Sequence, residues 1–338
     1  MSNRADYPGH PSEAHVPVTQ IYRKLEIVGK GSYGAVYKGE HIPSGTIVAL
    51  KIIDLDTEDD DAADIQREVA LLSQLRGEGA NVTQYYGSWL DGPNVWIVMD
   101  FAGGGSVRTL MKAMANGVLE ERWIVVIIRE ILIALAYLHK SNVIHRDIKT
   151  ANMLVQSSGK VVLCDFGVSA LLSSSHSKRT TFTGTPHYMA PEVISSSSYD
   201  SKADIWSLGI TIFEMATGSQ PLAELPSMQA LALIPKAKPP RLTEQQGGKE
   251  MRDFMTHCLK ELPSDRSTAD ELSRHKWIKN SSKTPSSSLR ELLLRYDKWA
   301  QAGGVRQSLA EPAPWEMDSD RSIFIFLCIL LISYHHFC

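Results

Sequence analysis

The segment His145-Arg146-Asp147-Ile148-Lys149-Thr150-Ala151-Asn152, followed by Asp165-Phe166-Gly167, decides the fold of this chain. The two segments supply carboxylates, a lysine and an amide in a fixed order. Phosphoryl transfer needs oxygen ligands for a metal ion, a group that positions the acceptor hydroxyl, and cations near the phosphate oxygens. Either segment alone recurs by chance, but the ordered pair predicts a phosphoryl-transfer site.

The composition of the whole chain is that of a globular protein. Its 338 residues are 43% hydrophobic and 22% charged, which argues against disorder throughout. The formal net charge of -3 provides no basic field of the kind that nucleic-acid binders use, so no nucleic-acid partner is expected. The cysteines have neither paired nor metal-binding spacing, and the polar amino terminus lacks the apolar core of a secretory signal. These features predict a reduced, cytoplasmic setting.

The residues before position 100 predict a small lobe built on an antiparallel sheet. Ile21 to Ile53 alternates β-branched and aromatic residues with glycine-containing turns, and Val95 to Met99 is a further strand. Asp64 to Leu75 carries apolar residues at helical spacing, so one helix should pack on this sheet. Residues 1–20 are polar and contain prolines, and we expect a flexible tail there.

A larger helical lobe is expected after the triplet Gly103-Gly104-Gly105, which is a natural hinge. Glu120 to His139 is apolar almost all round, which is typical of a buried helix, and Ser201 to Thr217 is similar. Residues 281–288 are rich in serine. The folded domain is therefore expected to end near Ile278.

Residues 279–338 are expected to form a linker, a short amphipathic helix and an atypical apolar carboxyl terminus. Leu289, Leu292, Leu293 and Tyr296 form an apolar stripe that predicts a helix over 288–300, outside the folded domain. Ile323 to Ile332 is apolar without a break but covers only about half of the length that a bilayer-spanning helix needs. Residues 323–338 could be a non-native chain end, a weak membrane anchor or a docking segment. Membrane spanning is not expected.

A glycine-rich stretch, Gly29-Lys30-Gly31-Ser32-Tyr33-Gly34-Ala35-Val36, fits the pattern G-x-G-x-x-G-x-V. Glycines allow main-chain N–H groups to approach phosphate oxygens closely. A plain hairpin turn fits equally well, whereas a dinucleotide-binding turn would need a helix directly afterwards and the chain continues as a strand. Lys51 follows on the next strand, and Glu68 could hold it toward the phosphates of a nucleotide. Each of these two residues, taken alone, could also be an ordinary surface residue.

The first segment contains the candidate chemical groups. Asp147 would orient the acceptor hydroxyl and take its proton, and Lys149 would neutralise charge on the transferred group. Asn152 and Asp165 would hold Mg²⁺, which prefers oxygen ligands. His145 is expected to be a packed structural residue and not a base. Cys164 is likewise expected in the core, not as a nucleophile.

Together with Ala190-Pro191-Glu192, Asp204 and Arg266, these motifs make residues 21–278 resemble the eukaryotic protein kinases. The resemblance implies an α+β bilobal protein-kinase fold, with a small antiparallel-sheet N-lobe plus one helix (21–99), a hinge (100–105) and a larger, mainly helical C-lobe (106–278). It implies ATP and Mg²⁺ as cofactors. The implied nucleotide-binding residues are Gly29, Lys30, Gly31, Ser32, Gly34, Val36, Ala49, Lys51, Glu68, Met99, Asp100, Ala102 and Leu154.

The resemblance also implies specific roles for other positions. Met99 would be the gatekeeper, and Asp100 to Ala102 would contact adenine. Glu192 would pair with Arg266, and Asp204 would brace the catalytic loop.

Lys149 and Thr185 resemble the residues found at these positions in the serine/threonine class of kinases. The resemblance implies Asp147, Lys149 and Lys51 as the catalytic residues. The segments around Asp165 and Thr181 resemble the sterile-twenty-like germinal-centre kinases, subfamily III, and a fungal member in particular. This implies a regulatory set of Thr181, Arg146 and Thr185, with phosphorylated Thr181 bound by Arg146. His187-Tyr188 departs from the Phe-Trp that family members often carry beside the phosphoacceptor, which leaves the substrate preference open.

The implied function is transfer of the γ-phosphate of ATP to Ser or Thr of protein substrates, as an upstream signalling kinase in morphogenesis or cell division. Nuclear-Dbf-related kinases, an armadillo-like scaffold and a transient homodimer are implied partners. The alternative is a pseudokinase scaffold or binding module. It is disfavoured because Lys51, Asp147, Asn152 and Asp165 are all present.

Overall fold

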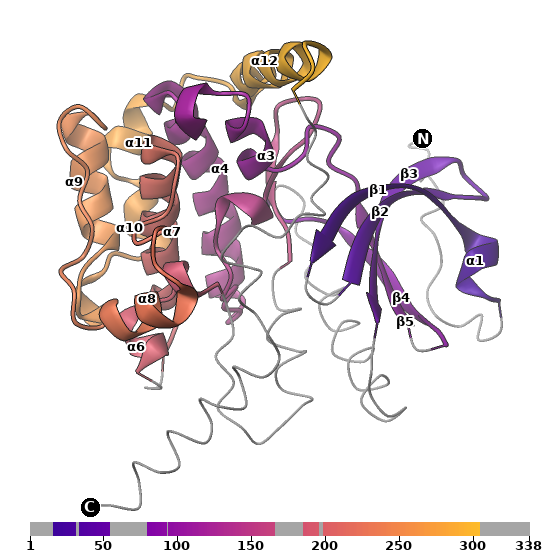
Figure 1. The fold of residues 1–338 in the computed structure, drawn as a ribbon, viewed down its shortest axis with the longest axis horizontal. Helices are drawn as coiled ribbons and strands as arrows, with labels where there is room; N and C mark the ends of the chain where they lie inside the picture. Colours follow the sequence, from indigo (N-terminus) through magenta and orange to yellow (C-terminus); the bar gives the residue numbers. More distant parts are fainter. Residues whose placement is uncertain are drawn as a thin grey trace, which may run out of the picture.

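The computed structural model describes residues 16–31, 34–54, 80–92, 94–165, 185–195 and 199–304. These residues form two lobes, one built on a β-sheet and a larger one built mainly of helices (Figure 1). The arrangement is the α+β bilobal fold that the sequence predicts.

Five antiparallel strands form the sheet of the N-lobe, in the order β1-β2-β3-β5-β4. The central strand β3 pairs with β2, which places Lys51 opposite Val36. It also pairs with β5, which places Ala49 opposite Met99. The strands are β1 Tyr22–Gly31, β2 Gly34–His41, β3 Thr46–Asp54, β4 Tyr85–Asp91 and β5 Asn94–Asp100.

Side-chain alternation along β3 divides the core of the N-lobe between the two faces of the sheet. Leu50 is fully buried in a cluster with Trp96, whereas Ala49 belongs to a second cluster with Met99. Successive side chains of a strand point to opposite faces. Lys51 therefore lies on the face of Ala49, away from the Leu50 cluster.

The chain enters the sheet through a short helix, α1 (Val18–Ile21). Val18 is only 2% exposed because it packs in one apolar cluster with Tyr22. Val18 to Gln20, which were expected in a flexible tail over residues 1–20, thus belong to the folded N-lobe, and residues 1–15 lie outside the described residues. The helix expected from Asp64 to Leu75, with Glu68, lies outside the described residues.

Two long buried helices, α4 (Glu121–Lys140) and α7 (Lys202–Thr217), form the centre of the C-lobe. Both are apolar on most sides, as the sequence predicts, and both contribute to the main hydrophobic core. The other elements are α3 Val107–Met111, β6 Met153–Val155, β7 Val161–Leu163, α6 Pro191–Ile194, α8 Ser227–Leu233, α9 Lys249–Cys258, α10 Ala269–Ser273, α11 Lys276–Asn280, α12 Arg290–Gln301, and 3-10 turns at Ala115–Gly117, Thr150–Asn152, Pro186–Tyr188, Pro263–Asp265 and Ser286–Leu289.

The connection between the lobes passes through Gly104, whose backbone N–H donates to the carbonyl oxygen of Val155 at 2.9 Å. A Cβ atom at position 104 would lie 2.5 Å from that oxygen and 2.8 Å from Cδ2 of Leu293. Such contacts are too short for any side chain. The glycine is therefore required by the close approach of β6 and α12.

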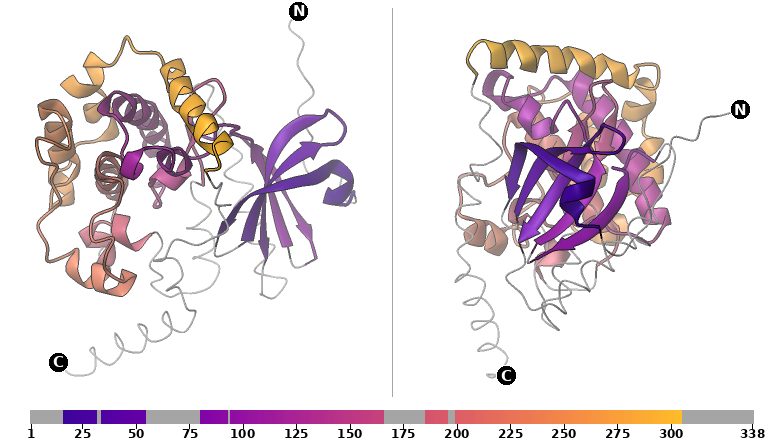
Figure 2. Two further views of the ribbon diagram at one scale, coloured as in Figure 1. Left: turned by 45° about the horizontal axis from the view of Figure 1, so that its top comes forward. Right: turned by 90° about the vertical axis from the view of Figure 1, so that its right-hand side faces the viewer.

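Helix α12 lies along the C-lobe next to α3 (Figures 1 and 2). Leu289 and Leu292 are fully buried, and Tyr296 is 5% exposed. All three belong to the main core of the C-lobe. The structure thus differs from the expectation that this helix lies outside the folded domain, because its apolar stripe completes the C-lobe core.

Ion pairs and cation–π contacts also hold α12 on the start of α4. The guanidinium of Arg122 donates two hydrogen bonds to Glu291, at 3.0 and 3.1 Å. Arg295 donates to Glu120 at 3.1 Å. Both guanidinium groups lie over the ring of Trp123, at 4.6 and 4.7 Å from its centroid. Cations over an indole ring are attracted to its face, so these contacts reinforce the packing.

The apolar run Ile323–Ile332 lies outside the described residues. Within the part of the chain that the structure describes, no helix combines the length and the apolar character needed to cross a bilayer.

Candidate active site

The loop that carries Asp147 connects α4 to β6. Hydrogen bonds to Asp204 of α7 hold this loop in place. The carboxylate of Asp204 accepts hydrogen bonds from the backbone N–H groups of His145 and Arg146, at 2.9 and 2.8 Å. It also contacts Nε2 of His139 at 2.8 Å. Asp204 is 1% exposed. The implied brace is confirmed, and His139 is an additional partner that the sequence does not point to.

His145 has a structural role, as expected. It is fully buried, and its Nε2 lies 2.9 Å from the carbonyl oxygen of Cys164, to which it donates. Its Nδ1 accepts from the backbone N–H of Asp147 at 3.2 Å. Both ring nitrogens are therefore engaged, which leaves none to act as a base. Cys164 is also buried, and burial raises the pKa of its thiol well above the usual value.

Asp147 lies at the centre of a compact polar network. The hydroxyl of Thr185 donates to Asp147 Oδ1 at 2.9 Å and accepts from Lys149 Nζ at 2.6 Å. Lys149 Nζ is also 3.0 Å from Asp147 Oδ2. Asn152 Nδ2 donates to the same oxygen at 2.9 Å. One carboxylate thus holds an aliphatic hydroxyl beside an ammonium group.

The electrostatics of this network keep Asp147 ionised. Burial alone would raise the pKa of its carboxyl group, but the charge of Lys149 and hydrogen bonds from Lys149 and Thr185 outweigh burial. The net result is a lowered pKa. At neutral pH the carboxylate is available as a hydrogen-bond acceptor and as a proton acceptor.

Lys51 of β3 reaches across from the N-lobe to Asp165, which follows β7. The distance from Lys51 Nζ to Asp165 Oδ1 is 2.8 Å. Burial would lower the pKa of this ammonium, but the charge and the hydrogen bond of Asp165 reverse the effect and raise it. Lys51 therefore remains a fixed cation at the junction of the lobes. The expected contact with Glu68 lies outside the described residues.

Two residues of this site have left-handed backbone conformations. Arg146 has φ of 72° and Asp165 has φ of 61°. Residues other than glycine adopt this backbone region at a cost in free energy. Residues with such strained backbones are often found at functional sites. The surrounding hydrogen bonds, including the one from Arg146 N to Asp204, hold the strained geometry.

Asn152 and Asp165 offer a donor set that fits Mg²⁺. Asn152 uses its amide nitrogen on Asp147, which leaves its side-chain oxygen for a cation. Asp165 uses Oδ1 on Lys51, which leaves Oδ2. Hard divalent cations prefer such oxygens. The backbone N–H of Cys164 donates to the carbonyl oxygen of Asn152 at 3.0 Å, so the two candidate ligands lie on neighbouring segments.

The predicted nucleotide-binding residues that the structure describes come from both lobes. Ala49 and Met99 are 7% and 9% exposed and pack in one cluster with Val36. Leu154 comes from β6 of the C-lobe and forms an isolated bridge with Ser106. The remaining positions are Gly29, Lys30, Gly31 and Gly34 on the paired strands β1 and β2, Asp100 at the end of β5, and Ala102 after it, while Ser32 lies outside the described residues.

Asp100 and Ala102 take part in the backbone of the connection between the lobes. Asp100 Oδ1 accepts from the Tyr86 hydroxyl at 2.5 Å. The carbonyl oxygen of Ala102 accepts from Gly105 N at 3.1 Å. These bonds shape the segment that leads from β5 to α3.

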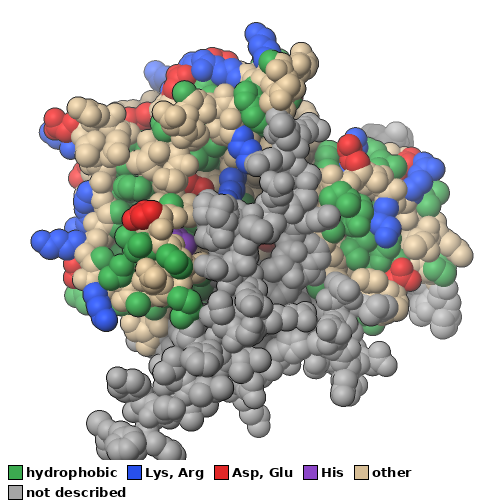
Figure 3. All heavy atoms as spheres, in the orientation of Figure 1, with side chains coloured by type: hydrophobic (Ala, Val, Ile, Leu, Met, Phe, Trp, Pro, Cys, Tyr) green, Lys and Arg blue, Asp and Glu red, His purple; other side chains and the backbone are tan. Residues whose placement is uncertain are grey.

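His187 and Tyr188 follow Thr185 and Pro186 and are 2% and 4% exposed. Burial lowers the pKa of His187, whose Nε2 is 3.4 Å from the carbonyl oxygen of Leu225. Helix α8 packs against this turn. Figure 3 shows hydrophobic side chains gathered on this side of the C-lobe, where Met228 and Leu233 of α8 are exposed.

The regulatory candidates are only partly described. Thr181 lies outside the described residues. The guanidinium of Arg146 lies 5.6 Å from the centroid of the Tyr199 ring. Its Nε is buried without a hydrogen-bond partner in the described part of the chain. A buried donor of this kind is costly unless a partner reaches it.

Glu192 and Arg266 form the implied ion pair. Arg266 Nη1 and Nη2 donate to the two carboxylate oxygens of Glu192, at 2.5 and 2.8 Å. The guanidinium also lies over the ring of Trp206, 5.0 Å from its centroid. The sequence gives no signal of this stacking.

Glu214 of α7 is buried as well. The sequence could have pointed to it, because a carboxylate within an otherwise apolar helix is unusual.

The chain matches the protein kinase domain family over residues 22–278. It is 43% identical over 308 residues to serine/threonine-protein kinase KIC1 of Saccharomyces cerevisiae, covering 90% of this chain and 28% of that protein. It is 42% identical over 294 residues to serine/threonine-protein kinase ppk11 of Schizosaccharomyces pombe, covering 87% of this chain and 91% of that protein.

A third relative is serine/threonine-protein kinase sid1 of Schizosaccharomyces pombe. It is 48% identical over 260 residues, which cover 77% of this chain and 54% of sid1. The chain thus spans about a quarter of KIC1, half of sid1 and most of ppk11.

Proposed function

The chain belongs to the protein kinase family, with relatives in its sterile-twenty-like germinal-centre branch, and from this premise we propose that it transfers the γ-phosphate of ATP to serine and threonine hydroxyls of proteins. One observation supports this activity most directly. The carboxylate of Asp147 accepts a hydrogen bond from the hydroxyl of Thr185 while Lys149 contacts both groups. A substrate hydroxyl would need the same two partners.

In the proposed reaction, Asp147 accepts a hydrogen bond from the incoming hydroxyl and receives its proton. Its lowered pKa keeps it ionised before the reaction. Lys149 compensates the negative charge beside the transferred group. Asn152 keeps the Asp147 carboxylate oriented through the bond to Oδ2. These residues are already in contact, so little reorganisation is needed when a hydroxyl arrives.

The family uses ATP as phosphate donor and Mg²⁺ as metal cofactor. Lys51 would hold phosphate oxygens, because its ammonium is fixed at the junction of the lobes. Asn152 would hold Mg²⁺ through Oδ1, and Asp165 through Oδ2. When bound, the cation neutralises charge on the phosphate oxygens. Val36, Ala49, Met99 and Leu154 would form apolar walls for the adenine ring.

A scaffold without phosphoryl transfer is the second candidate. It would not need Lys51, Asp147, Asn152 and Asp165 to be present together. Their contacts in one site favour the enzyme.

Phosphorylation of a generic basic protein tests the proposal. Radiolabelled ATP would be given to the parent, to Asp147→Asn and Asp165→Ala, and to Asp270→Asn, which changes an exposed carboxylate on α10 as a control. We expect losses of about 100-fold or more in the first two variants and none in the control. Label on serine and threonine would support the acceptor class. Equal rates in all four proteins would exclude phosphoryl transfer by this site.

We also propose the pathway and partners that the resemblance implies. The protein would act as an upstream signalling kinase in morphogenesis or cell division, with nuclear-Dbf-related kinases as substrates. It would bind an armadillo-like scaffold and form a transient homodimer. Copurification from cells, followed by phosphorylation of each recovered protein in vitro, would test them. The cytoplasmic location expected from the sequence stays a prediction.

A further inference from the structure

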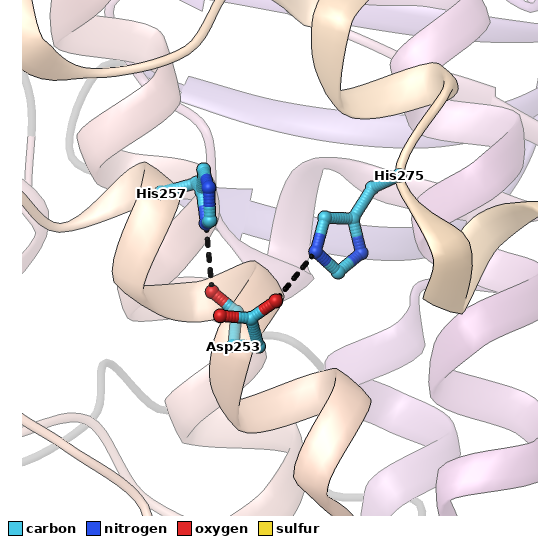
Figure 4. Close-up of side chains that lie close together, drawn as sticks. All are labelled: Asp253, His257 and His275. Atoms are coloured by element: carbon cyan, nitrogen blue, oxygen red, sulfur yellow. Dashed lines mark hydrogen bonds and ion pairs between the residues drawn. The ribbon is translucent and has the colours of Figure 1, made fainter.

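Three side chains with metal-binding atoms meet on the C-lobe, on helices that take no part in the candidate active site. Asp253 and His257 belong to α9, and His275 directly precedes α11. One ligand atom from each lies within 4.8 Å of the other two. Figure 4 shows both imidazole rings beside Asp253. Asp253 and His257 are four residues apart, which places them on one face of the helix.

His257 is held in the form that a metal ligand requires. Its Nδ1 lies 3.0 Å from the backbone carbonyl oxygen of Asp253, and a carbonyl can only accept. The ring therefore carries its proton on Nδ1 and presents a lone pair on Nε2. Metal-binding histidines usually have this second bond, which sets the tautomer and the ring orientation.

The other two groups are already spaced like ligands of one ion. Asp253 Oδ2 lies 3.1 Å from His275 Nε2. Neighbouring ligands of a tetrahedral Zn²⁺ with bonds near 2.0–2.1 Å are about 3.3 Å apart. Only small side-chain movements would bring the three atoms around one cation.

Packing restricts the His275 ring. It lies edge-on against Phe254, with ring centroids 5.3 Å apart, and 5.5 Å from the His257 ring. Its Nδ1 accepts a hydrogen bond from the backbone N–H of Trp277 at 3.2 Å. A cation on Nε2 would move the ring proton to Nδ1. Metal binding therefore breaks the hydrogen bond from Trp277 N–H that caps α11. The metal affinity is lower than that of a site without this competing bond.

The cluster is open to solvent. The ammonium group of the adjacent Lys276 does not compete with a metal ion for the Asp253 carboxylate, because it is paired elsewhere. The side chain of Asp253 is 60% exposed, which provides a path for an ion. The neighbouring Lys276 is paired with Glu250 at 2.8 Å. An entry path and oriented ligands are both requirements of a metal site.

We propose that Asp253, His257 and His275 bind one divalent transition-metal ion of the Zn²⁺ class, with water completing its coordination. Two imidazoles and one carboxylate suit Zn²⁺, whereas Mg²⁺ requires mainly oxygen ligands. The bound ion would join α9 to the residue that caps α11. The proposal is independent of the phosphoryl-transfer site, because the three ligands lie on α9 and before α11.

The test is a calorimetric Zn²⁺ titration of the full chain, with excess Mg²⁺ present. Asp253→Asn and His257→Ala each remove one ligand, and Asp270→Asn is the matched control. We expect the Zn²⁺ affinity to fall at least about 10-fold in the two ligand variants, since even the loss of an outer-shell partner costs this much. The control should bind like the parent. Thermal midpoints without metal would verify that all variants are folded.

Cysteines outside the described residues could bind Zn²⁺ independently, so the same titrations are repeated with Cys328 and Cys338 both changed to serine. Co²⁺ then serves as a spectroscopic probe of imidazole and carboxylate ligation in that protein. A Co²⁺ spectrum that disappears in His257→Ala supports the proposal. Absence of binding, or equal Zn²⁺ affinity in the parent and both ligand variants, would overturn it.

Discussion

Arg266 and Glu192 form a buried ion pair in which two guanidinium nitrogens bind the two carboxylate oxygens. The side chain of Arg266 is fully buried, and its remaining donors reach backbone carbonyl oxygens, including that of Lys260 at 2.8 Å. The pair connects the residues after Pro191 to the segment before α10.

Removal of one partner of this pair should destabilise the protein strongly. Glu192→Gln leaves the Arg266 charge buried without its counter-charge, which typically costs about 3–5 kcal/mol. The exposed pair of Arg252 and Glu244, at 3.2 Å, is the matched control. Glu244→Gln should change the free energy of unfolding by about 1 kcal/mol or less. Urea denaturation measures both, and equal losses would contradict the assignment of a structural role to the buried pair.

Thr185→Ala should reduce kcat by about 10- to 100-fold. The hydroxyl bridges Asp147 and Lys149, and one hydrogen bond to a charged group contributes about 1.5–3 kcal/mol. Thr185→Ser retains the hydroxyl and should keep most of the activity. Steady-state kinetics with one peptide substrate distinguishes the variants. If serine and alanine are equally impaired, the methyl group matters and the bridge does not.

Glu214→Gln should stabilise the protein at neutral pH. Glu214 is 4% exposed, and its Oε2 has no hydrogen-bond partner in the described part of the chain. Burial raises its pKa above the usual 4.5 and outweighs the opposing hydrogen bonds of Thr150 and Tyr188 to the carboxyl group. The folded state therefore loses stability as pH rises through 4.5 toward the raised pKa, and the loss is complete above it.

The gain from Glu214→Gln should be about 1–2 kcal/mol at pH 8, because the amide removes a buried charge. It should shrink toward zero as the pH approaches 4.5, where the parent is protonated in the folded state. Urea denaturation from pH 4.5 to pH 8 measures this trend. A gain that does not depend on pH would show that charge burial is not its cause.

Phosphorylation of Thr181 should activate the enzyme through Arg146. Within the described residues, Nε of Arg146 has no hydrogen-bond partner, so it offers a donor that a phosphate dianion could use. Phosphatase treatment of the parent and the change Thr181→Ala should both lower activity, and Arg146→Ala should add little to Thr181→Ala. Full activity of Thr181→Ala, where phosphatase abolishes that of the parent, would refute this role.

Leu292→Ala should cost about 2–5 kcal/mol of stability, because the side chain is fully buried in the C-lobe core. Leu294 lies two residues away on the same helix and is 60% exposed. Leu294→Ala should therefore change the free energy of unfolding very little. Similar, small losses for both variants would place α12 outside the folded domain, as its sequence alone suggests.

The two lobes could be predicted from the sequence because their signals are local. Alternation of side chains identifies the strands around Lys51, and apolar residues on most sides identify α4 and α7. The order of Asp147, Asn152 and Asp165 indicates the chemistry, since each residue type has few roles in phosphoryl transfer. The structure brings these residues together as the motifs suggest, while their roles in the reaction remain predictions.

Contacts between distant segments could not be predicted in the same way. The stripe of Leu289, Leu292 and Tyr296 shows that one face of α12 is buried, but the pattern is the same whether the partner is this chain or another protein. His139 gives no signal of its contact with Asp204. His275 likewise gives no signal of its position beside Asp253, because that proximity depends on how α9 and α11 pack.

The position of α12 also determines where the remainder of the chain begins. Leu293 lies against Gly104, so α12 brings the chain back to the connection between the lobes (Figure 2). Helix α12 therefore fixes the point from which any segment attached to its end starts. When a linker is short and flexible, the segment attached through it has a local concentration on the order of millimolar. A cis contact with the lobes can then be occupied even when the same contact between separate molecules would be too weak to form.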